Sequence, residues 1–444
     1  MVIRTTRETF VLFMFTMGLF LHAMAAYSIG PVPIEWMAQT GFIALYVYMI
    51  FRFRIFLFPG YLIFAVFFIW AIFVSIYHFS FSNFDSFMAT GATTGYIPFI
   101  FLRFFKILSF LSAVGITYWL LCVGKRKELV NNIVSIGFII AIYSVYVYIA
   151  QVYGLPELPR TRMGTGGGDQ NVTFTYAFHR AMGSFREPSH LAEWIVVPLF
   201  LSYFNKQKVL NIKSFLMGTT LLLTGSLTGI ISSVIGFFTA SAITFKLKKA
   251  TFANMLMFFL PYLVGFFMFS LISISNSSSG SASLIDTLWD RVEPLISGGG
   301  VKESNRSYVY EYVDNHSFPV FGQGYGNANI LFGKEVGFSS TASFLNLFLV
   351  NVYSVGMIGV SLLIIFFAYP YFLHFFKNKG RARSNFVFIL AAYNAWVLIF
   401  LMHAEELSVF FAIIYALFVY QLKESKMEDG DSEHRGSSSL GVSL

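Results

Sequence analysis

The chain has little charge and almost no cysteine. Asp, Glu, Lys and Arg make up 12% of its 444 residues, against roughly 25% in soluble domains. The single cysteine, Cys122, lies in an apolar run, which excludes an intramolecular disulfide and a metal site built from several cysteines. This composition excludes an ordinary soluble domain.

Several signatures of other protein classes are also missing. The glycine-rich stretch 164–168 is not followed by Lys and Ser or Thr, so it does not match a phosphate-binding loop. No duplicated halves with matching broken helices are visible, as an alternating-access transporter would have. The outer connections described below contain no Asp-x-Asp pair. We therefore expect no metal and no cofactor.

The chain is instead rich in long apolar runs. Hydrophobic residues make up 56% of it, and the runs approach the roughly 20 residues that cross a bilayer as a helix. We predict an all-α, polytopic integral membrane protein of about twelve transmembrane helices, although only Gly225-Ser226 separates the seventh and eighth. The predicted spans are 10–29, 34–51, 55–77, 104–124, 129–153, 188–204, 214–226, 227–245, 252–274, 341–371, 386–404 and 407–422.

Basic residues give the orientation. They gather in every second connection, for example Arg52 and Arg54, Lys125-Arg126-Lys127 and Lys246 to Lys249. Short loops rich in Lys and Arg stay in the cytoplasm, so we expect both termini to be cytoplasmic. This pattern accounts for most of the net charge of +8 without nucleic acid as a partner.

We expect one transmembrane domain over 1–422 and a disordered cytoplasmic tail over 423–444, which is polar. Two outer loops are large, at about 154–187 and 275–340. In the second loop, apolar residues at 284, 288, 292 and 295 recur at helical spacing, and a second helix is expected from Lys302 to about Asn315.

Arginines are unusual in outer loops, yet both large loops carry them. These six are Arg160, Arg162, Arg180, Arg186, Arg291 and Arg306. The densest cluster of ionisable residues runs from Arg180 to Trp194 and leads directly into a span, where charges tend to be functional. Each arginine could equally pair with a nearby carboxylate.

Three further charges lie close to span ends. Arg103 and Lys106 could contact a lipid phosphate or snorkel to the interface. Glu406 belongs to the segment 403–406, which forms a short outer connection and could be merely solvated.

Four segments resemble blocks of the O-antigen polymerase and O-antigen ligase superfamily. The first is Arg180-x-x-Gly183-x-Phe185-x-Glu187-Pro188-Ser189-x-Leu191-Ala192, and the second is Leu223-Thr224-Gly225-Ser226. The third runs from Asn315-His316 through Pro319 to Gly322-Gln-Gly324-Tyr-Gly326, and the fourth from Asn346 to Gly356-Met-Ile-Gly359. Their order along the chain matches that of the superfamily.

Two positions depart from the superfamily's pattern. Leu227 follows the Leu-Thr-Gly-Ser block where Arg is common, and Ser339 to Ser343 replace a His-Asn pair that ligases tend to carry. The second departure favours a polymerase over a ligase.

The resemblance implies a glycosyltransferase of the bacterial inner membrane. It would polymerise undecaprenyl-diphosphate-linked oligosaccharide repeat units on the outer face, among membrane lipids and alongside chain-length regulator and flippase proteins. A ligase that moves finished polysaccharide to lipid A core or another acceptor is the first alternative. A polysaccharide or lipid transporter is the second.

The resemblance and the chemistry together suggest site residues. Fixed cations would stabilise the departing diphosphate, which suits the bidentate fork of Arg180, Arg186, Arg291 and Arg306. A base would take the acceptor's proton, and Glu187 and His316 are the candidates. Glu187 could instead cap the helix that starts at Pro188. Arg160, Arg162 and Tyr308 are further candidates for diphosphate or sugar binding.

Overall fold

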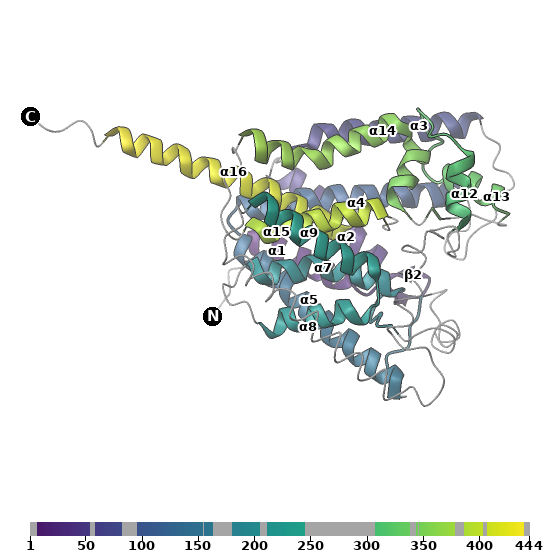
Figure 1. Cartoon of the computed structure of the whole chain (residues 1–444), viewed down its shortest axis with the longest axis horizontal. Helices are drawn as coiled ribbons and strands as arrows, with labels where there is room; N and C mark the ends of the chain where they lie inside the picture. The colour runs from purple at the N-terminus through teal and green to yellow at the C-terminus, as the bar shows by residue number, and fades with distance from the viewer. Residues whose placement is uncertain are drawn as a thin grey trace, which may run out of the picture.

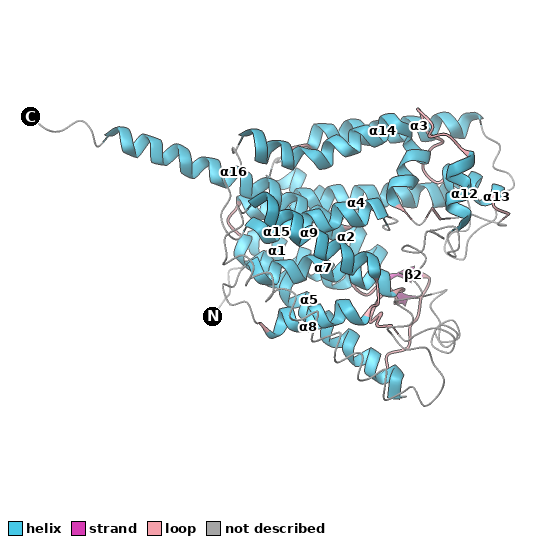
Figure 2. Cartoon of the chain, in the orientation of Figure 1, coloured by secondary structure: helices cyan, strands magenta, loops and turns pink. Residues whose placement is uncertain are grey.

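The chain folds into a helical bundle in a computed structural model (Figures 1 and 2). The structure describes residues 7–53, 58–81, 96–153, 155–162, 180–204, 211–244, 307–337, 343–344, 346–377, 386–402 and 406–438. The first helices are α1 (Arg7–His22), α2 (Ile34–Phe53), α3 (Tyr61–Phe81), α4 (Tyr96–Cys122), α5 (Arg126–Tyr153), α7 (Pro188–Phe204) and α8 (Ile212–Leu223). The later ones are α9 (Leu227–Thr244), α12 (Ser307–Asn315), α13 (Asn327–Glu335), α14 (Leu347–Phe372), the π-helical turn η3 (Leu373–Lys377), α15 (Phe386–Met402) and α16 (Val409–Ser438).

Apolar helices dominate the described part of the chain, which indicates a membrane-embedded protein. Five helices there are long and apolar enough to cross a bilayer: they lie in α2, α3, α4, α5 and α14, the last continuing to Phe376. Three shorter apolar helices lie in α8, α9 and α15. Each predicted span overlaps a helix except 252–274, which lies outside the described residues, and the span predicted over 10–29 extends beyond α1, which ends at His22.

Helix α7 lies at the centre of the bundle. It packs against α5, α8, α9, α15 and α16, and nearly all of its side chains from Leu191 onward are buried. Around it, α1 packs on α2, α2 and α16 pack on α4, and α3 packs on α14. In Figure 1 the small α12 and α13 lie at the right end of the bundle with strand β2 (Val32–Pro33), and α16 runs out to the left.

The turn between α8 and α9 confirms the break expected at Gly225-Ser226. Gly225 takes a φ of 55°, which favours glycine. Ser226 caps α9 by accepting a hydrogen bond from the Gly229 amide at 3.4 Å. Beyond the turn α9 packs mainly on α15, where a Cβ on Gly236 would lie 2.7 Å from the Ala391 carbonyl. Small residues thus let the two backbones approach closely.

Helix α14 is broken at Gly356, where φ is 69° and ψ is 179°. We predicted an uninterrupted span here. The break frees backbone groups that an intact helix would pair, and the segment 319–324 pairs several of them. The amides of Gln323 and Gly324 donate to the carbonyls of Tyr353 and Ser354 at 2.8 and 2.7 Å.

Further backbone groups at the break are paired as well. The Met357 and Ile358 amides donate to the carbonyls of Pro319 and Val320 at 2.9 and 3.3 Å. The Trp70 indole of α3 donates to the Val355 carbonyl at 2.8 Å. Irregular backbone is tolerated at membrane depth only where such partners bury it. The glycine-rich segment 319–324 therefore completes α14.

Helix α13 is a further difference from the sequence prediction. Residues 327–335 form this helix where we predicted loop, and Ala328, Ile330 and Phe332 are buried in it. In the segment predicted as the tail, which begins at Lys423, α16 continues to Ser438. Extending an existing helix avoids the nucleation step, and Lys, Glu and Met favour helix.

Candidate functional site

A hairpin between α1 and α2 holds segments of the predicted outer loops at one end of the bundle. Its strands are β1 (Ser28–Ile29) and β2 (Val32–Pro33), which pair antiparallel. Thr161 of the segment 155–162 joins β1, because its Oγ1 accepts from the Ser28 amide at 2.8 Å and donates to the Ser28 carbonyl at 3.0 Å. Ala26 donates to the Ser184 carbonyl at 2.9 Å. The hairpin and Ala26 thus fix both described parts of the first loop that was predicted to lie outside, at 155–162 and 180–187.

Arg160 supports the block that resembles the superfamily. Its guanidinium donates to the carbonyls of Gly183 and Phe185 at 2.8 and 3.0 Å. Burial lowers the pKa of Arg160, and the nearby Tyr27, Glu157 and Tyr143 oppose that shift. Arg160 therefore holds the backbone of 183–185 in place, and its side chain does not line the pocket described below.

Arg180 joins two blocks of the resemblance. Its Nε donates to the Thr224 carbonyl at 2.7 Å, and the amide of Ala181 donates to the Leu223 carbonyl at 2.8 Å. Arg180 lies against Gly225, where a Cβ would come within 3.3 Å of Nε. These contacts fasten the block 180–192 to the turn between α8 and α9.

A charged pocket of about 130 Å³ opens at this end of the bundle. Helices far apart in sequence build it: α1 and α15 end near it, α2 and α7 begin at it, and α4 passes it. Its lining residues are His22, Ala25, Glu35, Gln39, Lys106, Arg162, Phe185, Arg186, His190, Glu193, Trp194, Trp396, Glu406, Leu407 and Ser408. Three cations face three carboxylates, and two histidines and two indoles complete the lining. We call it the charged pocket.

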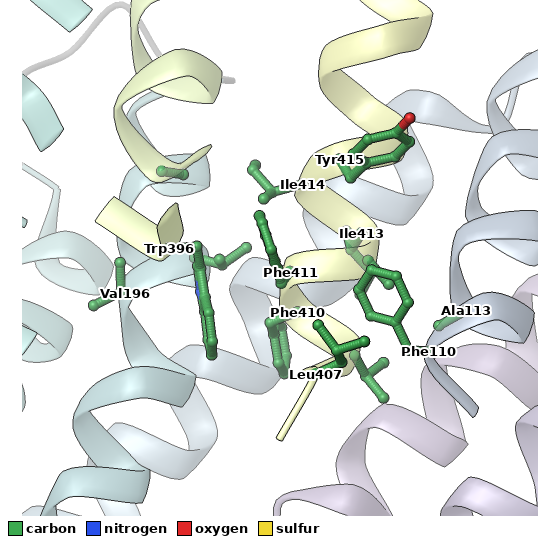
Figure 3. Close-up of a cluster of buried hydrophobic side chains, with 14 of the residues drawn as sticks. Phe110, Ala113, Val196, Trp396, Leu407, Phe410, Phe411, Ile413, Ile414 and Tyr415 are labelled. Carbon is green, nitrogen blue, oxygen red and sulfur yellow. The ribbon is translucent and has the colours of Figure 1, made fainter. Parts of the chain in front are cut away.

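The side of the charged pocket next to α16 is continuous with the apolar core. Trp396 and Leu407 line the pocket and also belong to the buried cluster of Figure 3. The Trp396 ring stacks on Phe411 with centroids 5.9 Å apart, and Trp194 packs edge-on against Phe410 at 4.5 Å. The indole nitrogens of Trp194 and Trp396 are buried without a hydrogen-bond partner among the described residues.

Arg162 is held by a carboxylate in the charged pocket. Its guanidinium donates to Glu35 Oε2 at 2.8 Å and to the Ala25 carbonyl at 2.7 Å. His22 Nε2 lies 4.0 Å from the other oxygen of Glu35. Pairing with a carboxylate was the alternative that we gave for each arginine, and for Arg162 the partner comes from α2. This buried group positions the start of α2 against the segment 155–162.

Arg186 is the exposed cation of the charged pocket. No hydrogen bond or ion pair joins its side chain to another residue in the described ranges. It precedes the first turn of α7, where backbone amides point outward and favour anions. His190 and Glu193 line the pocket one and two turns along α7. Arg186 is therefore positioned to bind an anion.

Lys106 and Glu406 form an ion pair inside the charged pocket. Their side chains are 15% and 30% exposed, so the pair is partly buried. Lys106 therefore does more than snorkel, and Glu406 is not simply solvated. Its neighbour Arg103 places its guanidinium over the Phe99 ring, 5.2 Å from the centroid.

Glu187 and His316 lie outside the lining of the charged pocket. Glu187 is exposed at the start of α7: its carbonyl accepts from the Leu191 amide at 3.3 Å, and its carboxylate accepts from the Ser189 hydroxyl at 3.3 Å. It thus stands where a helix cap stands, and a carboxylate there is favoured by the helix dipole.

His316 belongs to a separate aromatic cluster around α12, α13 and α14. Its ring stacks on Tyr312 at 4.2 Å and its Nε2 lies 3.2 Å from Glu335 Oε2. Tyr308 stacks on Phe332 with centroids 5.8 Å apart. The structure therefore brings neither His316 nor Tyr308 to the charged pocket.

Of the nine residues predicted for the site, Arg162 and Arg186 line the charged pocket, and Arg160 and Arg180 support the backbone beside it. Arg291 and Arg306 lie outside the described residues. The sequence prediction missed His22, Glu35 and Gln39. The available signal was their position: Glu35 and Gln39 are polar residues four apart at the start of a predicted span, on the same side of the bundle as Arg186.

The comparisons with known proteins leave the family open. No protein-family model matches the chain, and a search of curated proteins finds no match either. Within the residues that the structure describes, no group of three or more His, Cys, Asp or Glu side chains could hold a metal ion.

Proposed function

We propose that the chain is a polytopic glycosyltransferase of the bacterial inner membrane. It spans the membrane about twelve times, with both termini in the cytoplasm and the charged pocket on the outer face. It joins undecaprenyl-diphosphate-linked oligosaccharide repeat units into an O-antigen, capsular polysaccharide or exopolysaccharide. Lipid-linked oligosaccharide is its substrate, and chain-length regulator and flippase proteins are its expected partners.

The observation that carries this proposal is Arg186. It is an exposed arginine at the mouth of a pocket, without a partner in the described part of the chain, next to the first turn of α7. An arginine fork binds phosphate oxygens bidentately and stays charged at any relevant pH. Such a cation stabilises the charge that grows on a departing diphosphate.

The orientation of the helices supports an outer-face pocket. Glu35 lies in the first turn of α2, and Arg52 lies in its last turn. A helix of 20 residues is about 30 Å long, so the basic end is separated from the pocket by one bilayer thickness. Lys125 to Lys127 likewise lie where α4 ends and α5 begins, away from Lys106 on α4.

Contacts between the resembling blocks also support the proposal. The block 180–192 is hydrogen-bonded to the Leu-Thr-Gly-Ser turn through Arg180 and Ala181. The block 315–326 is hydrogen-bonded to the block 346–359 at the break in α14. Four sequence blocks thus form two contacting pairs.

The alternatives predict different products. A ligase would transfer a finished chain to lipid A core or another acceptor, and the absence of the His-Asn pair before α14 favours a polymerase. A transporter needs a cavity that opens alternately to both sides. The charged pocket instead ends on the buried aromatic core around Trp396 and Phe411.

The test is turnover by the purified protein in lipid. Given only an undecaprenyl-diphosphate-linked repeat unit, it should lengthen the oligosaccharide and release undecaprenyl diphosphate, without nucleotide or ion gradient. Arg186→Ala should abolish polymer at unchanged protein level, and Arg186→Lys should restore it poorly. Lys127→Gln, at the opposite end of the bundle, is the control. Full polymer length in Arg186→Ala would remove this residue from the site, and turnover only with a proton gradient would favour a transporter.

A further inference from the structure

The Lys106–Glu406 ion pair stands between two cavities. Both residues line the charged pocket, and both also line a second cavity of about 30 Å³ on the other side of the pair. The lining of the second cavity is Arg103, Lys106, Ile107, Tyr325, Leu347, Val350, Asn351, Glu406 and Leu407. The pair therefore separates the charged pocket from a smaller cavity whose lining includes the apolar side chains of Ile107, Leu347, Val350 and Leu407.

This position suits the junction of an amphipathic donor. A lipid diphosphate has two or more negative charges next to an apolar chain. Lys106, together with Arg103 on the same helix α4, can bind the negative charges of the diphosphate. Ile107, Leu347 and Val350 offer apolar surface to the beginning of the chain.

A diphosphate would compete with Glu406 for Lys106. Coulomb attraction is proportional to charge, so a multiply charged diphosphate at contact distance attracts the ammonium more strongly than one carboxylate does. Glu406 would then lose its partner while it still faces the charged pocket. An unpartnered carboxylate in a partly buried site is a better proton acceptor than one held by a lysine.

We propose that the donor's diphosphate takes Lys106 from Glu406, and that the released Glu406 carboxylate is the general base of the reaction. This inference rests on the proposed function, and it names a residue that neither the resemblance nor the sequence prediction assigned to catalysis.

The chemical step balances within these groups. The acceptor hydroxyl oxygen forms a bond to the anomeric carbon of the donor, and the bond from that carbon to the diphosphate oxygen breaks. The bonding electron pair leaves with the diphosphate, held by Lys106 and Arg186. The hydroxyl proton passes to Glu406 and then to water. When undecaprenyl diphosphate leaves, Lys106 and Glu406 pair again.

The other carboxylates of the pocket are less suited to this role. Glu35 is already held by Arg162 at 2.8 Å, with His22 on its other oxygen. Glu193 lies within α7, about one turn after His190, and it does not line the second cavity. Glu406 precedes α16 outside the helix, and its partner Lys106 is the cation that also faces the apolar cavity.

The proposed exchange predicts that Glu406→Gln changes the affinity for undecaprenyl diphosphate and the turnover rate in opposite directions. Glu406→Gln should bind undecaprenyl diphosphate about three- to tenfold more tightly, because Lys106 no longer has a competing carboxylate. The same variant should turn over at least about 100-fold more slowly, since it lacks the base. Lys106→Gln should bind undecaprenyl diphosphate about tenfold more weakly, and Lys106→Arg should fall between. A purely structural ion pair would weaken binding and turnover together.

Matched variants separate the exchange from folding. Arg126, the first residue of α5, and Glu424 of α16 form another partly buried ion pair, beyond the end of α4 that lies away from Lys106. Glu424→Gln should therefore change neither binding nor turnover. The swapped pair Lys106→Glu with Glu406→Lys keeps opposite charges together and should restore the melting temperature without restoring turnover. If the swapped protein is active, or if Glu406→Gln fails to bind more tightly, the exchange is wrong.

Failure of the proposed function is distinguishable from failure of the exchange. A wild-type protein that binds undecaprenyl diphosphate and forms no polymer would overturn the glycosyltransferase. The affinity of Glu406→Gln for undecaprenyl diphosphate would still decide whether the anion displaces this carboxylate. If wild-type turnover is observed and Glu406→Gln retains it within about threefold, Glu406 is not the base.

Discussion

Gly322 and Gly356 meet backbone to backbone. A Cβ on Gly322 would lie 2.4 Å from the amide nitrogen of Gly356, and a Cβ on Gly356 would lie 2.3 Å from the Val320 carbonyl oxygen. Both residues have positive φ, at 78° and 69°. The contact joins the segment 319–324 to the break in α14. Each position requires glycine because its φ is positive and because a Cβ there would collide with backbone atoms.

Gly356→Ala should therefore destabilise the protein strongly. The substitution adds a steric clash with backbone to a conformation that is essentially restricted to glycine, so we expect a loss of about 3 kcal/mol or more. The melting temperature of the purified protein in detergent, followed by size-exclusion chromatography after heating, measures it.

Gly30→Ala is the control for this prediction. Gly30 also has positive φ, at 58°, but a Cβ there would meet nothing within 4 Å. Gly30→Ala should lower the free energy of unfolding by only about 1–2 kcal/mol, which is the cost of placing a residue with a Cβ in the left-handed region. Equal losses in both variants would show that the close contact at Gly356 contributes nothing.

Substitutions of Arg160 and Arg186 should differ in their effect on stability. Arg160→Ala leaves the buried carbonyls of Gly183 and Phe185 without their donor, which should lower the free energy of unfolding by about 2–4 kcal/mol. Arg186→Ala removes an exposed side chain and should change stability by at most about 0.5 kcal/mol.

Measuring thermal stability and polymer formation side by side separates these two roles. Arg160→Ala should lose both in parallel, and lower growth temperature should recover part of its activity. Arg186→Ala should lose activity at every temperature. A stable and fully active Arg160→Ala would mean that the backbone of 183–185 keeps its position unaided.

His316→Gln and Glu187→Gln test the two bases predicted from sequence. Neither residue lines the charged pocket, so each variant should keep turnover within about threefold. The exposed pair of His316 with Glu335 should contribute about 0.5 kcal/mol or less to stability. Rates of repeat-unit transfer for both, beside Glu406→Gln, identify the base. A 100-fold loss of turnover in either variant would identify that residue as the general base.

Gly236 and Gly41 form a contrasting pair within helices. Gly236→Ala places a methyl group 2.7 Å from the backbone of α15 at Ala391 and Ala395, so it should separate α9 from α15 and lower stability by about 1–3 kcal/mol. Gly41 is exposed on α2 with nothing near its Cβ position, so Gly41→Ala should raise stability by up to about 1 kcal/mol. A melting-temperature shift of the same sign in both would contradict the close packing of α9 on α15.

The sequence predicted the helices well because apolar runs and basic connections are local signals. It did not predict the break in α14, since glycines are common in transmembrane helices and nothing near Gly356 in sequence indicates that residues 319–324 pair with it. The sequence did not predict helix α13 either, because this helix has few apolar residues and follows a glycine-rich turn.

The charged pocket was only partly predictable for a similar reason. Arg186 stood out because it belongs to a dense cluster of charges. Lys106 and Glu406 each looked like an ordinary charge near a span end, and 300 residues separate them. Their pairing depends on how α4 packs against α16, which no local pattern in either helix specifies.

The break in α14 also dictates an order of assembly. Tyr325 binds Ser75 of α3, which is synthesised long before it, whereas the partners of Pro319 and Val320 are Met357 and Ile358, which are synthesised after it. The segment 319–325 can therefore contact α3 first. Its backbone is paired with α14 only after both halves of that helix have been synthesised. The docking of this segment on α14 therefore follows the synthesis of Ile358.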